Sequence, residues 1–506
     1  MVWVLGGLAA GAITAGLAEL LAGLLTRLGW VGGEPSPVLA VGAAFIDLTP
    51  PWLKDFAIST FGTHDKTALL VGMAVVLVTA CVVVGLLLRA RPQLALVVLA
   101  LLGVVGLAAV LTRPGAQPLD AVPTVLGVAA GLALLTGVRR ALVREPVAES
   151  SGATRRSALT LVGLGVAGGA LTALGGRALA AGQRTVQAAR ERFVVPRVAR
   201  PVTVPAGAEL GVPGITPFVV PQRDFYRIDT ALVVPQVDPA TWRLRVHGMV
   251  DRTVEIDWET LQSKPMQEAM VTLMCVSNEV GGDLNGNAIW TGWPVRELLR
   301  EAGVRPGADM VLSTSTDGFT AGTPLEALTD ERNALIAIAM NREPLTPEHG
   351  FPARLVVPGL YGYVSATKWV TDLKVTRFAD DEGYWTPRGW SARGPVKMSS
   401  RIDVPGGGDR IAPGTVAVAG VAWAQHTGIR AVQVRVDDGP WQAARLGADA
   451  TVDAWRQWVF SWRATPGEHT LAVRAQDRTD AWQTEEEAPP APDGSTGYHR
   501  IYVVVQ

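Results

Sequence analysis

Cys275 is the residue whose type and surroundings are best suited to chemistry. It follows the apolar run Thr272-Leu273-Met274 and begins the polar loop Val276-Ser277-Asn278-Glu279-Val280-Gly281-Gly282. A strand that ends at such a loop would present a thiolate at its end. Most single cysteines are instead buried and inert. Spacing alone leaves both interpretations open, and a Cys–His–Asn hydrolase with His349 as its base is one form that the chemistry could take.

Composition excludes several other kinds of site. The two cysteines, Cys81 and Cys275, are too few for a disulfide scaffold or for an all-cysteine zinc or iron–sulfur site within this chain. None of the six histidines lies in a predicted membrane span, so a bis-histidine haem in the membrane is not expected. No Gly-x-Gly-x-x-Gly follows a predicted strand, which leaves nucleotide cofactors without support. The net charge of −1 gives no reason to expect nucleic acid as a partner.

The chain has two parts of different composition. Its 506 residues predict about three or four domains. Residues 1–187 carry 13 Lys and Arg against 8 Asp and Glu, whereas the remainder carries 32 against 38. Only three of the 16 tryptophans lie in the first part. These differences predict a membrane section joined to a water-soluble section.

Five apolar runs in the first part are long enough to cross a bilayer, which takes about 20 helical residues. They are Val2–Leu25, Thr67–Leu88, Pro92–Leu111, Ala121–Val138 and Ala158–Ala181. Arginines gather in the 89–92 turn and the 139–156 loop, which would lie on the same side, and this bias marks the cytoplasmic side. We therefore expect a multi-pass cell-membrane protein with a cytoplasmic N-terminus and an extracytoplasmic C-terminal two-thirds.

Two features of the membrane section have alternative interpretations. Arg155 and Arg156 precede the fifth run, either as a twin-arginine export signal or as the inner end of an ordinary helix. Glu19 is the only acidic residue well inside an apolar run. An intramembrane carboxyl is a candidate for function, although it could instead pair near a helix end.

Four domains follow from the pattern along the chain: a transmembrane domain (1–182), a proline-rich linker (183–222), an α+β domain (223–394) and an all-β domain (395–506). The α+β domain has predicted strands at 242–246 and 254–258 and predicted helices at 295–302 and 325–328, without the strict alternation of a doubly wound sheet. The last domain has evenly spaced strands and a hairpin signal at Asp438-Gly439, which predict an immunoglobulin-like sandwich.

The segment around Cys275 resembles the molybdenum-binding core of the sulfite oxidase family. Met274-Cys275-Val276-Ser277-Asn278 is followed by Trp290-Thr291-Gly292-Trp293-Pro294-Val295. Other segments that match the family lie in family order: Asp224–Arg227 with Val234–Pro239, Asp317-Gly318-Phe319, His349–Gly359 and Thr367–Val370. The resemblance covers roughly residues 220–506, and the five-span front lies outside the family's enzyme core.

The resemblance implies a molybdopterin cofactor whose metal is held by one cysteine thiolate, here Cys275. It further implies that His349, Arg354 and Lys368 contact the pterin, where the guanidinium would meet its phosphate. Arg227 would supply positive charge to an oxyanion, and Tyr384 stands for the family's substrate-side tyrosine among different neighbours. The predicted catalytic residues are Cys275, Arg227 and Tyr384. The predicted cofactor-binding residues are Tyr226, Arg227, Cys275, Asn278, Thr314, Ser315, His349, Arg354, Thr367 and Lys368.

One departure from the family bears on the substrate. Sulfite-oxidising members tend to read Cys-Ala-Gly-Asn-Arg-Arg at the metal, whereas this chain has Glu279 and Val280 in place of the two cations. We expect that the acidic side chain weakens sulfite binding by charge repulsion.

The function expected from these observations is that of a membrane-anchored, extracytoplasmic molybdopterin-dependent oxidoreductase. It would transfer an oxygen atom to or from a small oxyanion or an S- or N-oxide. The expected partners are a small-molecule substrate, membrane lipid, a separate cytochrome or quinone that carries electrons, and, by analogy, a second copy of the chain. The alternative is a catalytically silent, membrane-tethered binding or scaffold protein that retains the fold.

Overall fold

The computed structural model describes residues 1–28, 30–50, 65–113, 115–143, 151–179 and 183–506, with a few isolated positions between 53 and 61. The chain folds into two compact units. The helical unit comprises Met1–Thr185 and Ala231–Val234, and the sheet unit comprises Val186–Thr230 and Pro235–Gln506. The side chains of Arg155 and Arg156 lie outside the described residues, so the predicted export signal is outside this description.

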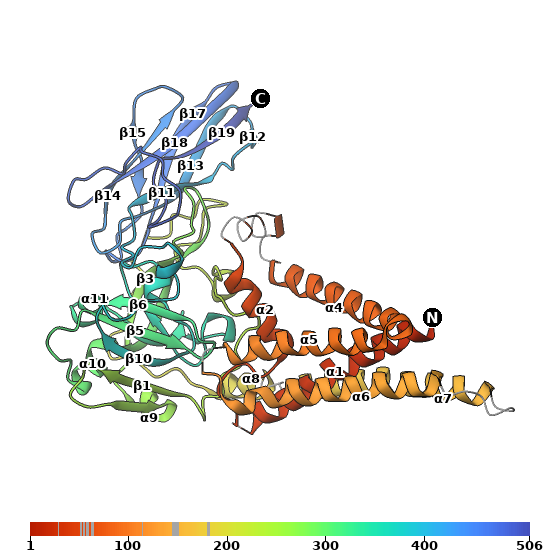
Figure 1. The fold of residues 1–506 in the computed structure, drawn as a ribbon. Coiled ribbons are helices and arrows are strands. Elements are labelled where there is room, and N and C mark those ends of the chain that lie inside the picture. Colours follow the sequence, from red (N-terminus) through yellow and green to blue (C-terminus); the bar gives the residue numbers. More distant parts are fainter. Residues whose placement is uncertain are drawn as a thin grey trace. The chain divides into compact units, whose positions relative to one another are not determined.

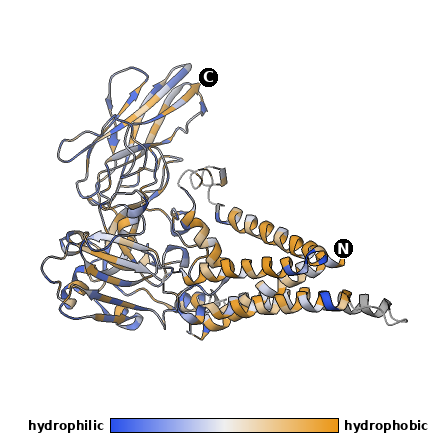
Figure 2. Cartoon of the chain, in the orientation of Figure 1, coloured by the Kyte–Doolittle hydropathy of each residue, from blue (hydrophilic) through white to orange (hydrophobic). Residues whose placement is uncertain are grey.

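The helical unit consists of long apolar helices (Figures 1 and 2). They are α1 (Val2–Arg27), α2 (Pro37–Leu48), α4 (Asp65–Ala90), α5 (Pro92–Leu111), α6 (Val122–Val143) and α7 (Ser151–Leu179), with the 3-10 turn η2 (Pro118–Ala121) before α6. In the described part of the chain, four helical segments are long and apolar enough to cross a membrane: Val2–Arg27, Lys66–Ala90, Pro92–Leu111 and Pro118–Val143. The predicted fifth run lies in α7, of which only Gly165–Gly176 counts as a shorter apolar stretch. Five spans therefore stay a prediction.

Glycines let the backbones of these helices approach closely. A Cβ added to Gly7 of α1 would lie 2.6 Å from the main-chain nitrogen of Gly85 in α4. One added to Gly169 of α7 would lie 2.5 Å from the carbonyl carbon of Ala12 in α1. Small residues of this kind are typical of helix contacts in membranes. Cys81 of α4 packs against Gly11 in the same way, which fits a packing role for this cysteine.

The N-terminal part of the sheet unit contains two mainly antiparallel sheets (Figure 1). One has the order β2-β1-β10-β5-β6, and the other has the order β3-β4-β7-β8 with β9 beside β7. The strands are β1 (Arg243–Gly248), β2 (Val254–Asp257), β3 (Gln267–Met274), β4 (Asn285–Pro294), β5 (Met310–Ser315), β6 (Thr320–Pro324), β7 (Leu335–Met340), β8 (Glu343–Pro344), β9 (Arg354–Val356) and β10 (Val370–Thr376). β1 and β10 pair in parallel, and the other pairs are antiparallel, so the prediction that the sheet is not doubly wound is confirmed.

Short helices connect these strands: α9 (Trp258–Ser263), α10 (Val295–Ala302), α11 (Leu325–Thr329) and α12 (Gly362–Ser365). α10 has the predicted bounds and buries Val295, Leu298, Leu299 and Ala302, the spacing of one helical face. It ends at Gly303, whose φ of 73° is left-handed. The predicted linker begins with a helix, α8 (Gln183–Arg192), and beyond it the short 3-10 turn η3 (Gln222–Asp224) is assigned before β1.

The C-terminal part is a β-sandwich with sheet orders β11-β13-β17-β16 and β12-β19-β18-β14-β15. Its strands are β11 (Ser399–Val404), β12 (Arg410–Ile411), β13 (Gly414–Trp423), β14 (Ile429–Val436), β15 (Gln442–Ala443), β16 (Arg445–Leu446), β17 (Arg456–Ala464), β18 (Gly467–Asp477) and β19 (His499–Val505). The core includes Val418, Trp458, Val473 and Val503. The hairpin predicted at Asp438-Gly439 joins β14 and β15. The structure supports a sandwich, and its immunoglobulin-like type stays a prediction.

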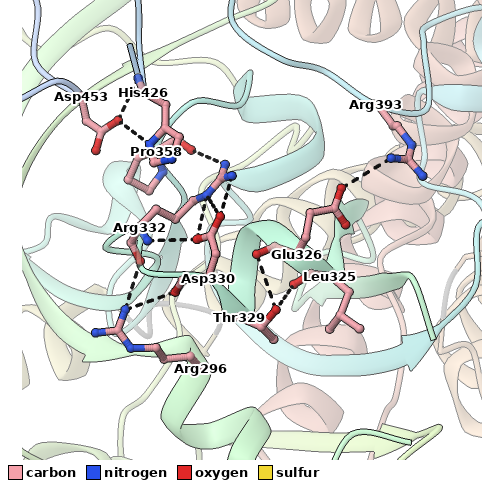
Figure 3. A network of polar contacts seen from close by, with 10 residues as sticks. All are labelled: Arg296, Leu325, Glu326, Thr329, Asp330, Arg332, Pro358, Arg393, His426 and Asp453. Carbon is pink, nitrogen blue, oxygen red and sulfur yellow. Dashed lines mark hydrogen bonds and ion pairs between the residues drawn. The ribbon is translucent and has the colours of Figure 1, made fainter. Parts of the chain in front are cut away.

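Polar contacts join the two parts of the sheet unit. The backbone N–H of Gly359 donates to Gln425 Oε1 of the sandwich at 3.0 Å. Close by, the Arg332 guanidinium pairs with Asp330 at 2.8 Å and donates to the carbonyl of Pro358 at 3.1 Å (Figure 3). The segment His349–Gly359, one of the motifs that match the family, thus bonds to the sandwich at its last residue.

Candidate functional site

Cys275 lies where β3 ends, as the sequence predicted. Its backbone N–H donates to the carbonyl of Leu284 at 2.9 Å, and the N–H of Leu284 donates to Asn278 Oδ1 at 2.8 Å. These two bonds close the loop 275–284 between β3 and β4. The Cys275 thiol lines a cavity of about 150 Å³ inside the sheet unit. Burial raises the pKa of this thiol, the opposite of what an activated nucleophile needs without a metal or a cation.

Arg354, at the start of β9, is a buried cation on the wall of this cavity. Its guanidinium donates to the main-chain carbonyls of His349 and Ala366 at 3.3 Å and of Leu355 at 3.4 Å. Among the described residues no carboxylate forms an ion pair with it. Burial lowers the pKa of Arg354 to about 10. The guanidinium also lies over the Trp290 ring, 5.1 Å from its centroid. A buried cation held by long bonds to carbonyls and by an aromatic face is suited to receive an anion.

Asp229 joins two further cations that line the cavity. One of its oxygens, Oδ2, lies 2.8 Å from Lys368 Nζ and 2.9 Å from Arg227 Nε. The side chains of Asp229 and Lys368 are 4% and 9% exposed, whereas that of Arg227 is 38% exposed. Burial lowers the pKa of Lys368 to about 8, and the charge of Asp229 opposes this effect. The sequence had predicted both cations as site residues, but not the carboxylate between them.

His349 is buried on the same wall and is uncharged at neutral pH. Its Nε2 lies 2.9 Å from the carbonyl oxygen of Gln222. Burial, and next the charge of Arg354, lower the pKa of His349 to about 4. Because its ring bonds to Gln222, the arrangement gives no support to His349 as the base of a cysteine hydrolase.

An aromatic wall, defined here as Phe319, Tyr363, Trp385 and Trp390, forms another part of the lining. The ring centroids of Tyr363 and Trp390 lie 5.9 Å apart, and those of Trp385 and Trp390 lie 6.2 Å apart. Tyr384 is not among the described residues that line the cavity. Its ring contacts two members of this wall, with centroid distances of 5.8 Å to Phe319 and 5.1 Å to Trp385.

A fully buried hydroxyl of the lining has no hydrogen-bond partner among the described residues. It belongs to Ser315, which is buried at the end of β5 and lines the cavity. Ser313 and Thr367, in contrast, satisfy each other through a 2.7 Å bond between their hydroxyls. Ser315, unlike Ser313, is therefore able to donate to a ligand in the cavity.

The structure brings together seven of the predicted site residues. Tyr226, Arg227, Cys275, Ser315, His349, Arg354 and Lys368 all line the cavity. Asn278, Thr314, Thr367 and Tyr384 are not among its described lining residues. Asp229 and three residues of the aromatic wall (Tyr363, Trp385 and Trp390) were not predicted. The Arg-x-Asp spacing of Arg227 and Asp229 was the only local signal for Asp229, and it is a weak one.

Comparisons with known proteins agree with this geometry. Residues 231–385 match the family model described as the oxidoreductase molybdopterin binding domain. The uncharacterized oxidoreductase YuiH of Bacillus subtilis is 34% identical over 165 residues, which are 33% of this chain and 80% of YuiH. Human mitochondrial sulfite oxidase is 28% identical over 332 residues, and the match spans 54% of this chain and 59% of that enzyme.

A solved structure is similar in fold. The crystal structure of the sulfane dehydrogenase SoxCD from Paracoccus pantotrophus matches with a TM-score of 0.50 at 23% identity, over 62% of this chain and 88% of that chain. The fold, the matched domain and the relatives agree with one another. The chain belongs to the sulfite oxidase family of molybdopterin-dependent oxidoreductases.

Proposed function

We propose that the cavity beside Cys275 holds the molybdopterin and that Cys275 is its metal ligand. The observation that carries this proposal is the donor set on one cavity: a thiol at a strand end, a buried guanidinium and the buried hydroxyl of Ser315. Within the described part of the chain, the guanidinium pairs with no carboxylate and the hydroxyl has no hydrogen-bond partner. Thiolate sulfur suits such a metal, and a metal-bound thiol is deprotonated. Arg354 would bind the phosphate, and Ser315 would donate to the pterin.

The remaining residues would hold the cofactor and the substrate in place. When bound, the cofactor supplies the two-electron chemistry by which an oxygen atom moves to or from the substrate. Tyr226, His349 and Lys368 would contact the pterin, and Arg227 would face the substrate. Tyr384 would position Phe319 and Trp385 of the aromatic wall. Asn278, Thr314 and Thr367 would act through the backbone of the cofactor-binding segments. The substrate would be a small oxyanion or an S- or N-oxide.

We propose that the helical unit anchors the enzyme in the cell membrane through five spans. The arginines at 89–91 and 139–140 support a cytoplasmic N-terminus and an extracytoplasmic catalytic part. Electrons would pass to or from a separate cytochrome or quinone. By analogy with the family, the immunoglobulin-like sandwich would pair with a second copy of the chain. The proposed domains are 1–182, 183–222, 223–394 and 395–506.

Elemental analysis tests the core of this proposal. The full chain is purified in detergent from a host that makes the cofactor and from a matched host that does not. We expect close to one molybdenum per chain in the first case and background in the second. A protein that is folded but free of molybdenum in both cases would overturn the proposal and favour a silent scaffold protein.

A further inference from the structure

We propose that Asp229 makes this enzyme select an uncharged substrate over an anion. The inference rests on the proposed function, since it takes the cavity beside Cys275 as the place where substrate binds. It deepens that function by choosing the S- or N-oxide class, a polar oxygen on a sulfur or nitrogen with apolar groups beside it, over small oxyanions.

The first step is the geometry of the carboxylate. Asp229 is almost fully buried, and its Oδ2 accepts from both Arg227 and Lys368 at 2.9 and 2.8 Å. Arg227 is the cation that would face an incoming oxyanion, and Lys368 is the second cation that shares the carboxylate. A cation already paired within 3 Å offers an anion less attraction, and the carboxylate itself repels it.

The second step is the charge of the whole lining. The described lining contains three cations, Arg227, Arg354 and Lys368, and two carboxylates, Asp229 and Asp317. His349 lines the cavity without charge at neutral pH. The phosphate of a bound pterin would add further negative charge. The side chains of the lining and the phosphate would then carry no net positive charge together, so they would compensate an anion poorly for the hydration that it loses.

The third step concerns the remaining side chains that line the cavity. The aromatic wall offers Phe319, Trp385 and Trp390 to the apolar groups of a ligand. The sequence had predicted repulsion of sulfite from Glu279, but that side chain is exposed and is not among the described lining residues. The carboxylate that repels an anion inside the cavity is Asp229 instead.

The test compares two probes of similar shape and different charge, dimethyl sulfone and sulfate. Binding to the molybdenum-loaded full chain is measured by calorimetry at constant ionic strength. We expect the wild type to bind dimethyl sulfone at least about tenfold more tightly than sulfate. Asp229→Asn should tighten sulfate binding at least about tenfold and change dimethyl sulfone binding less than about threefold. Adding Arg227→Gln to Asp229→Asn should reverse most of the gain for sulfate.

Asp317→Asn is the matched control, because Asp317 lines the same cavity and forms no ion pair among the described residues. We expect it to change sulfate binding less than about threefold. An equal gain from both variants would assign the selectivity to total charge and overturn the role of Asp229.

A wild type that binds dimethyl sulfone no better than sulfate, including one that binds neither, also overturns the inference, and this comparison needs no variant to fold. Absence of molybdenum would overturn the proposed function instead, so the two failures are distinguishable.

Discussion

The helical unit and the sheet unit use their apolar residues in opposite ways. In the helical unit, Val76, Leu101 and Val104 are 57–67% exposed, and the helices touch through glycines. In the sheet unit, the largest fully buried side chains include Trp242, Trp290, Trp293, Trp369, Trp455 and Trp458. Helices that face lipid gain little from hiding apolar side chains and associate by close backbone contact, whereas a unit in water buries its apolar surface.

Both units contain buried charges that join distant segments of their own unit. In the helical unit, the buried Asp120 accepts the N–H of Gly33, 87 residues away, at 3.0 Å. In the sheet unit, buried charges connect distant segments: Arg401 of β11 pairs with Asp403 and also reaches the Cys275 loop. Because these contacts stay within one unit, a substitution in one unit should leave the fold of the other unit intact. Each prediction below tests this independence of the two units.

The largest expected effect separates the two cysteines, one in each unit. Cys275→Ser should abolish turnover and molybdenum retention, because an alcohol does not replace a thiolate as a metal ligand. The free energy of unfolding should change by less than about 1 kcal/mol. Cys81→Ser is the control and should keep both properties, because Cys81 packs in α4. Elemental analysis and steady-state assays measure the difference, and molybdenum retained by the Cys275 variant would contradict the assignment.

The second effect concerns the contact of the sandwich with the Cys275 loop. Arg401 donates to the carbonyl of Gly282 at 2.6 Å and to Asn285 Oδ1 at 2.9 Å. Arg401→Gln would leave the buried Asp403 without its cation, which costs about 3–5 kcal/mol. Denaturant unfolding, followed by near-ultraviolet circular dichroism, should show this loss of stability. The variant should also retain molybdenum more weakly. Arg300→Gln, on the solvent-exposed face of α10, should cost less than about 0.5 kcal/mol.

If Arg401→Gln kept its molybdenum at wild-type stability, the sandwich would have no part in holding the loop. If it shifted the unfolding of the helices as well, the two units would be coupled and the comparison would fail.

Local patterns predicted the elements that depend on neighbouring residues. The apolar face of α10 and the left-handed Gly303 after it lie within nine residues, so the helix and its end were both visible. The end of β3 at Met274 was visible because an apolar run meets a polar loop. Motifs of the family then supplied His349, Arg354 and Lys368, which no spacing could have assigned.

What the sequence did not predict depends on contacts between distant residues. The role of Asp229 follows from its bond to Lys368, which lies 139 residues further along the chain. Tyr384 matched a family position, but its ring packs against Phe319 and Trp385 and is not among the described residues that line the cavity. The prediction of a linker over 183–222 missed α8. The prolines on which that prediction rested begin at Pro196, after the ten residues of this helix.

The third effect should be confined to the helical unit. Gly169→Leu would force a side chain into the backbone of Ala12, and overpacking of this kind costs about 1–3 kcal/mol. Gly163→Leu on the same helix is the control, because a Cβ there meets no atom of the described residues within 4 Å. Thermal unfolding in detergent, followed by circular dichroism at 222 nm, should show this loss of stability for Gly169→Leu alone. Both variants should keep wild-type molybdenum, and loss of it from Gly169→Leu would contradict the separation of the units.

The last effect, and the smallest per pH unit, is a difference in the sign of the pH dependence. Burial raises the pKa of Glu34, in the connection between α1 and α2, from 4.5 to about 7. The folded helical unit then holds a proton that the unfolded chain releases, so its stability should fall as the pH rises from 4.5 to 7. Burial lowers the pKa of His499 from 6.5 to about 4, and its Nδ1 accepts the N–H of Ile402 at 2.9 Å.

Protonation of His499 would break that bond, and the unfolded chain takes up the proton first. The stability of the sheet unit should therefore rise as the pH rises from 4 to 6.5. Each group contributes at most about 1.4 kcal/mol per pH unit. Unfolding followed at 222 nm for the helices and by near-ultraviolet circular dichroism for the tryptophans should give slopes of opposite sign. Glu34→Gln should flatten only the pH dependence of helix unfolding, and His499→Gln only that of the tryptophan signal, because each group titrates within its own unit.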